Sequence, residues 1–208
     1  MQPGVTRRRA VTGGLAVIAA PGARAQPAPA PQRIILNDAS RLNPTPVLKN
    51  WRPRLDKSDV FIEALRAELK EAATAGRPAA VGAARHSMGG QSLPKDGVAM
   101  TFNGISLEPD TARKTYRVNA GARWSEVIAA LDPLGFSPAV MQSNHDFGVA
   151  STFCVNAHGW PAPYGPFGTT VRSLRLMLAD GSVLECSRTQ NAELFGLAMG
   201  GYGLLGVI

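Results

Sequence analysis

The chain has 208 residues, of which 45% are hydrophobic and 18% are charged, with 22 Gly and 16 Pro. This length and composition exclude a wholly disordered chain and predict a globular protein of about one domain that is rich in turns. The net charge of +7 does not indicate nucleic-acid binding, because four of the 22 basic residues lie in the first 25 positions and the others are scattered, without interleaved aromatic residues.

The N-terminus has the pattern of an export signal. Within residues 1–25, three arginines at 7–9 precede a modestly apolar segment at 10–20 and an A-x-A cleavage site at 23–25. Paired arginines before a weakly hydrophobic segment are typical of the twin-arginine route, which exports folded proteins. The apolar segment is too short to span a bilayer. We therefore expect a periplasmic or secreted protein without a membrane span, and a disordered basic tail is the alternative.

Residues 26–57 are predicted to form a linker and an N-terminal extension. The segment begins with QPAPAPQ, whose prolines prevent both a helix and a strand ladder. We assign residues 58–208 to a single folded domain. The chain has only two cysteines, Cys154 and Cys186, so a disulfide framework is not indicated, while one bridge in an oxidising compartment stays open.

The first predicted helix begins at Ser58 or Asp59 and ends at Ala75. A capping residue opens it, and Gly76 with the nearby Pro78 stops it. The apolar residues that recur at helical spacing on one of its faces are Phe61, Leu65, Leu69 and Ala72.

A strand at 79–82, a Gly-rich loop and a second strand at 98–102 follow, and the turn signal Asn103-Gly104 ends this part. This order is typical of a βα-type unit. The strand at 115–119 and the helix at 124–134 predict a further βα element.

A hairpin is predicted at 173–187, with Asp180-Gly181 as a type I′ turn. A helix at about 192–199 follows it. The chain then ends in the apolar run GGYGLLGVI, and we expect it to be truncated, because natural termini are usually exposed and polar. The elements together predict an α+β fold.

The loop GAARHSMGGQS, residues 82–92, allows three kinds of chemistry. A hydrolase nucleophile turn needs G-x-S-x-G, and Arg85 stands where the first Gly should be. A metal site lacks ligands at recognisable spacing, because the chain has only His86, His145 and His158 besides Cys154. Small residues would let backbone N–H groups approach a phosphate, so a phosphate loop and a Gly-rich surface turn remain open.

Three segments, in this order, carry a resemblance to a known family. They are GAARHSMGGQ at 82–91, VASTFCVNAHG at 149–159 with GPFGTTVRSLRLMLADGSVLECS at 165–187, and ELFGLAMGGYGLLGVI at 193–208. They resemble the FAD-linked oxidases of the vanillyl-alcohol-oxidase and p-cresol-methylhydroxylase (PCMH) type, and among these the bacterial relatives of cytokinin dehydrogenase. The resemblance implies a PCMH-type FAD-binding domain of two α+β subdomains with the flavin between them.

The resemblance also implies a set of site residues. The first loop would bind the FAD pyrophosphate, with His86 bonded covalently to the flavin, although Arg85 stands where Gly is common. The second segment would line the flavin and its ribityl chain, with Cys154 in place of the usual Ser, and Ile208 would lie near the adenine. The implied FAD-binding residues are Ala83, Ala84, Arg85, His86, Ser87, Gln91, Gly148, Thr152, Cys154, His158 and Ile208.

The implied activity is oxidation of a small alcohol, sugar or lactone, or amine by hydride transfer to flavin N5, with O₂ or another electron acceptor. The substrate domain that follows in this family would be missing, and the alternative is a non-catalytic flavin-binding fragment. No metal is predicted, and no catalytic residue is assigned. The pair His145-Asp146 fits a loop cap better than a catalytic base.

Overall fold

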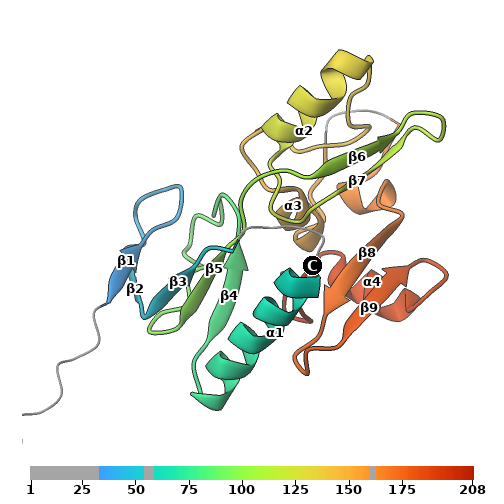
Figure 1. The fold of residues 1–208 in the computed structure, drawn as a ribbon. Coiled ribbons are helices and arrows are strands. Elements are labelled where there is room, and N and C mark those ends of the chain that lie inside the picture. The colour runs from blue at the N-terminus through green and yellow to red at the C-terminus, as the bar shows by residue number, and fades with distance from the viewer. Residues whose placement is uncertain (1–32, 54–58, 160–162) are drawn as a thin grey trace, which may run out of the picture. The chain divides into compact units, whose positions relative to one another are not determined.

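The computed structural model describes residues 33–53, 59–159 and 163–208 (Figure 1). The predicted signal peptide, the proline-rich stretch that follows it and the capping residue Ser58 lie outside these residues. The described residues belong to one structural unit, which spans residues 31–208. No helix within them is long and apolar enough to cross a membrane.

A parallel sheet of three short strands forms the first part of the unit. Its order is β3 (Lys49–Trp51), β5 (Val98–Thr101) and β4 (Ala79–Gly82). The central strand β5 is buried at all four positions, because strands flank it on both edges. The parallel pairing places the carboxyl ends of the three strands at one edge of the sheet.

Helix α1 (Asp59–Thr74) packs against this sheet, as the predicted periodicity required. Leu65 and Ala72 are buried with Val98 and Met100 of β5 in one hydrophobic cluster. Phe61 stacks at the edge of the same cluster, 6.3 Å from the ring of Trp51. The helix thus connects β3 and β4 and covers the apolar face between them.

The N-terminal extension contains strands that the sequence analysis did not predict. Strands β1 (Ile34–Leu36) and β2 (Thr45–Val47) pair antiparallel, and β3 joins the parallel sheet. Each has three residues, which is too short for an alternation pattern to be recognised. Their pairing partners, and not local propensity, determine them.

The second part of the unit begins with the antiparallel pair β6 (Leu107–Asp110) and β7 (Thr115–Val118). Helix α2 (Trp124–Leu131) follows and ends after a 3₁₀ turn at Gly135, which has a left-handed φ of +75°. The prediction for β7 and α2 is confirmed, but β7 pairs with β6 and does not form a βα crossover. The sequence analysis did not predict β6, because Pro109 lies within it and a proline inside a run argues against a strand.

The remaining elements are α3 (Val149–Cys154), a 3₁₀ turn at Phe167–Thr169, the hairpin of β8 (Ser173–Met177) and β9 (Val183–Ser187), and α4 (Ala192–Ala198). The hairpin is confirmed, but its turn is not type I′. That turn needs a positive φ at both central residues, and of the pair Asp180-Gly181 only Gly181 has one, at +82°. The N–H of Gly181 donates to the carbonyl of Leu178, which fits a longer loop with a left-handed Gly.

Trp124 anchors the hydrophobic core of this second part. Its side chain is completely buried, and its ring meets Phe167 edge to face at 5.0 Å. Its Nε1–H donates to the hydroxyl of Thr152, which is also completely buried. The indole therefore both fills the core and satisfies a buried polar group of α3.

We predict that Trp124→Phe lowers the free energy of unfolding by about 1–3 kcal/mol, because it leaves a cavity and removes a buried hydrogen bond. Urea unfolding measures this. Leu134→Ala, at a residue that is 46% exposed, is the control and should change stability by less than about 0.5 kcal/mol. Equal effects of the two substitutions would contradict this description of the core.

Candidate functional site

The loop after β4 presents a run of unused backbone donors. Arg85 has a φ of +51°, in the left-handed region that favours Gly. Among the hydrogen bonds between described residues, none uses the N–H of Arg85, His86, Ser87 or Met88. Successive free N–H groups beside a left-handed residue form a concavity that binds anions. The backbone of this loop therefore fits a phosphate.

Asp38, in the segment between β1 and β2, binds the second half of the loop at 82–92 through Gly90. The residue is 4% exposed, and its carboxylate accepts hydrogen bonds from the N–H of Gly90 at 2.9 Å and from the Asn43 amide at 2.7 Å. A hydrogen bond from the Ser40 side chain, together with these contacts, lowers the pKa of Asp38. The sequence analysis missed Asp38, which lies 52 residues before Gly90.

Two further contacts hold the loop on either side of its free N–H groups. The N–H of Ala39 donates to the carbonyl of Arg85 at 2.9 Å, and the Asn43 amide donates to the carbonyl of Met88 at 3.0 Å. These bonds use the carbonyl groups and leave the N–H groups available. The loop is thus held in one conformation by the N-terminal segment.

The guanidinium of Arg85 lies at the carboxyl edge of the sheet with a donor that has no partner. Its side chain covers Gly82, where an added Cβ would lie 3.1 Å from its Nε. This Nε is buried and donates to no group of the described chain. Burial and the charge of Arg52, which directly follows β3, lower the pKa of Arg85. Two cations, Arg52 and Arg85, and the unsatisfied Nε of Arg85 lie at the carboxyl edge of the sheet. This arrangement favours an anionic ligand there.

His86 is joined to a residue far away in the sequence. Its Nε2 lies 2.7 Å from the Asp146 carboxylate, whose other oxygen accepts a hydrogen bond from Arg123. The ring of Phe147 meets the imidazole edge to face at 4.5 Å. The hydrogen bond with His86, and then that with Arg123, lowers the pKa of Asp146. Asp146 therefore acts as the ionised partner of His86 and not merely as a loop cap.

Gly148 brings the second predicted segment against the first loop. A Cβ at Gly148 would lie 2.9 Å from the Cβ of Ala83 and 3.1 Å from the hydroxyl of Ser151. No larger residue fits at this approach without movement. The predicted site residues Ala83, His86 and Gly148 are thus brought together by the fold.

Other predicted site residues of this segment serve the packing of α3. The hydroxyl of Thr152 lies 2.9 Å from both the Trp124 indole nitrogen and the Gly148 carbonyl. Burial raises the pKa of Cys154 to about 11, so its thiol stays protonated at neutral pH, and both cysteines are free. His158 is exposed beyond the helix end. The roles of these residues in cofactor binding stay predictions.

The last residues of the chain are bonded to the second segment and to β8. The N–H of Tyr202 donates to the carbonyl of Cys154 at 2.8 Å, and Val207 exchanges two backbone hydrogen bonds with Met177. Ile208 is half-buried against the core cluster that includes α3. The third motif is therefore held beside the second.

Two other predicted site residues lie in the first loop. The hydroxyl of Ser87 donates a hydrogen bond to the hydroxyl of Ser92, while Gln91 is exposed.

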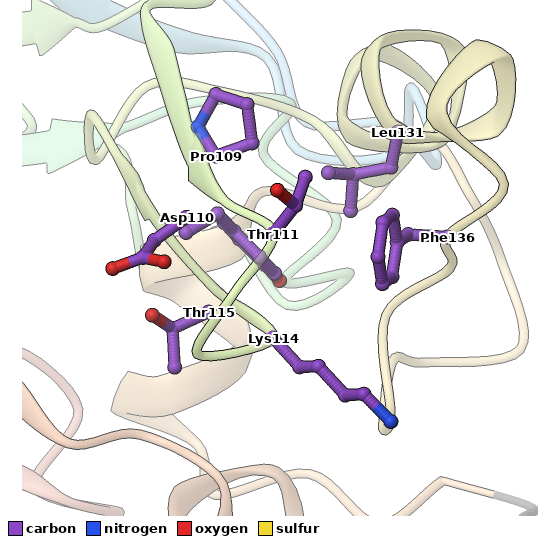
Figure 2. Close-up of a pocket in the computed structure, with 8 residues that line it drawn as sticks. Pro109, Asp110, Thr111, Lys114, Thr115, Leu131 and Phe136 are labelled. Atoms are coloured by element: carbon purple, nitrogen blue, oxygen red, sulfur yellow. The ribbon is translucent and has the colours of Figure 1, made fainter.

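A small hollow lies apart from these motifs, between the β6–β7 hairpin and the end of α2 (Figure 2). Burial raises the pKa of Tyr116 in its wall to about 12, so the hydroxyl stays protonated. The lining residues are Pro109, Asp110, Thr111, Lys114, Thr115, Tyr116, Leu131 and Phe136. None of them belongs to the predicted site. The described residues also include no group of three or more His, Cys, Asp or Glu placed to hold a metal ion.

Comparison with known proteins identifies the family. A family model described as an FAD binding domain matches residues 62–187. The chain belongs to this FAD-binding family. The resemblance to FAD-linked oxidases of the PCMH type is thereby confirmed, and the matched region contains both the loop at 82–92 and α3.

Individual relatives of this FAD-binding chain are oxidases. Alditol oxidase of a Streptomyces species is 32% identical over 133 residues, which are 62% of this chain and 32% of that protein. L-Gulonolactone oxidase of Mus musculus is 34% identical over 102 residues, or 49% of this chain and 23% of that protein. The chain thus matches about a third or less of the length of these curated relatives.

The fold matches a solved structure. The crystal structure of 6-hydroxy-D-nicotine oxidase from Arthrobacter nicotinovorans superposes with a TM-score of 0.65 at 21% identity. The match covers 70% of this chain and 32% of that one. The predicted α+β FAD-binding fold is therefore confirmed.

The hydrogen bonds to Asp38 predict the behaviour of the FAD-binding chain in acid. Because folding lowers the pKa of Asp38, its stabilising effect is complete above the usual Asp value of about 4 and is lost as the pH falls through the lower folded value. Asp38→Asn should therefore be less stable than wild type at pH 7, with a smaller difference at about pH 3. Urea unfolding across this range measures it, with Asp59→Asn as control. A pH-independent difference would contradict the role of Asp38.

Proposed function

We propose that this chain is the FAD-binding part of an exported flavin-dependent oxidoreductase that acts on a small alcohol, a sugar or lactone, or an amine. The oxidase relatives support the reaction class, and O₂ or another acceptor would reoxidise the flavin. The basic and weakly apolar N-terminus supports export to the periplasm or beyond. The observation that carries the proposal is the loop at 82–92, where free N–H groups and a histidine lie in the family's cofactor position.

The residues present fit FAD. A pyrophosphate carries two negative charges, and the N–H groups of 85–88 with the unsatisfied Nε of Arg85 form a matching donor set. When bound, the flavin supplies hydride acceptance, while the protein binds and orients it. The chain's own contribution would then be to bind the pyrophosphate at this loop and to orient the imidazole of His86 through Asp146.

We further propose that His86 bonds covalently to the flavin. The support is its position in the family motif, its partly exposed ring and its fixed orientation between Asp146 and Phe147. A covalent link would prevent loss of the cofactor after export.

Arg85→Gln tests the pyrophosphate site. We predict that it weakens FAD binding about tenfold or more, because it removes a charge-assisted contact, and leaves riboflavin binding unchanged, because riboflavin lacks phosphate. Titration of the flavin-free chain, followed by flavin fluorescence, measures both affinities. Arg77→Gln, at an exposed arginine after α1, is the matched control. Equal weakening of FAD and riboflavin would show that Arg85 supports the fold instead.

His86→Ala tests the covalent link. We expect the wild-type chain, expressed with FAD, to keep its yellow colour after acid precipitation and to show flavin fluorescence on a denaturing gel. The variant should still bind FAD but release it in acid, since no other side chain is proposed to bond to it. His145→Ala is the control at an exposed histidine outside the implied FAD-binding set. Acid-stable flavin in His86→Ala would place the bond elsewhere.

A further inference from the structure

The contact between His86 and Asp146 determines which ring nitrogen carries the proton. An ionised carboxylate can only accept hydrogen bonds, so at 2.7 Å the Nε2 of His86 must be the donor. Arg123 donates to the second carboxylate oxygen and favours the ionised form. A neutral His86 therefore carries its proton on Nε2 and has its lone pair on Nδ1.

The backbone around Asp146 fixes this arrangement. The N–H of Ser125 donates to the carbonyl of His145 at 2.7 Å, and the N–H of Trp124 donates to the carbonyl of Phe147 at 3.1 Å. Both donors lie in the first turn of α2, directly after Arg123. His145 and Phe147 are thus both bonded to the N-terminal end of α2. The cationic partner of Asp146, Arg123, directly precedes the same helix end.

We propose that Asp146 is a positioning residue that holds the proton of His86 on Nε2 and so keeps the lone pair of Nδ1 available for attachment to the flavin. This inference rests on the proposed attachment at His86 and goes beyond it by naming Asp146 as the residue that orients the imidazole and determines its tautomer. Phe147 supports the selection, because its ring contacts the imidazole and limits rotation about the side-chain bonds. Arg123 acts one step further away, by keeping Asp146 charged and in place.

The chemistry of attachment gives Asp146 a second effect. Attachment would join Nδ1 to the 8α methyl carbon of the flavin, and that carbon would lose one proton. The electron pair of the broken C–H bond would pass to the flavin and then to dioxygen. The dioxygen would take up the released proton and one from solvent and would leave as hydrogen peroxide. The imidazole becomes positively charged when Nδ1 uses its lone pair. The Asp146 carboxylate stabilises this charge through the same Nε2–H contact.

The first test needs no flavin and no substitution. Nitrogen NMR of the flavin-free wild-type chain, recorded above the pH at which the His86 ring becomes neutral, should show a protonated Nε2 and an unprotonated Nδ1. A protonated Nδ1 in the neutral ring would overturn the proposal. In Asp146→Asn we expect a mixture of the two tautomers, because the neutral amide can either accept or donate.

The second test follows attachment itself. Asp146→Asn should slow the formation of acid-stable flavin about ten- to hundredfold, by analogy with the loss of an orienting partner at metal-ligating histidines, and Asp146→Glu should restore part of the rate. His145→Ala, at the exposed neighbouring residue, is the control. An unchanged rate in Asp146→Asn would overturn the proposal, and so would a bond found at Nε2 in the isolated flavin peptide.

These outcomes are distinct from failure of the proposed function. A wild-type chain that binds no FAD in the titration contradicts the proposed function as a whole. A chain that binds FAD and shows the expected tautomer, but forms no acid-stable flavin, contradicts attachment at His86 and the assignment of Nδ1 as the bonding atom. Attachment that does not depend on Asp146 contradicts only the further inference.

Discussion

The candidate site depends on the contact between the loop after β4 and the segment before α3. Gly148 lies against Ala83 where no added Cβ would fit, and Asp146 bonds to His86 across 60 positions of sequence. The parallel sheet with α1 determines where the loop begins. The core around Trp124 determines where Asp146 and Gly148 lie. Neither part alone forms the site, because each supplies one side of these contacts.

The loop at 82–92 combines a strained backbone with unsatisfied polar groups, and this combination indicates a ligand site. A left-handed Arg85 costs about 1–3 kcal/mol, and its buried Nε lacks a partner in the described chain. Free N–H groups beside it add further unsatisfied donors. Asp38 and Asn43 hold the loop in this conformation although it uses few of its own hydrogen bonds. Such an arrangement is expected where a ligand completes the structure.

The sequence predicted the elements whose patterns are long or strongly marked. The periodicity of α1, the bounds of α2, the apolar strand β5 and the β8–β9 hairpin were all recognisable. Strands β1 to β3 were not, because three residues carry no alternation, and Pro109 hid β6. The family motifs identified the loop and His86. The pairing of His86 with Asp146 could not be predicted, since it depends on how α2 holds the segment at 145–149 and not on any local pattern.

The central claim is that the backbone of the loop at 82–92 binds the phosphates of FAD. Amide hydrogen exchange of the N–H groups of 85–88, measured with and without FAD, tests it most directly, because these groups have no partner in the described chain. We predict fast exchange of these groups without FAD and strong protection with it, while exposed amides in the β6–β7 turn stay unchanged. Bound FAD with no change in exchange at 85–88 would contradict phosphate binding by this loop.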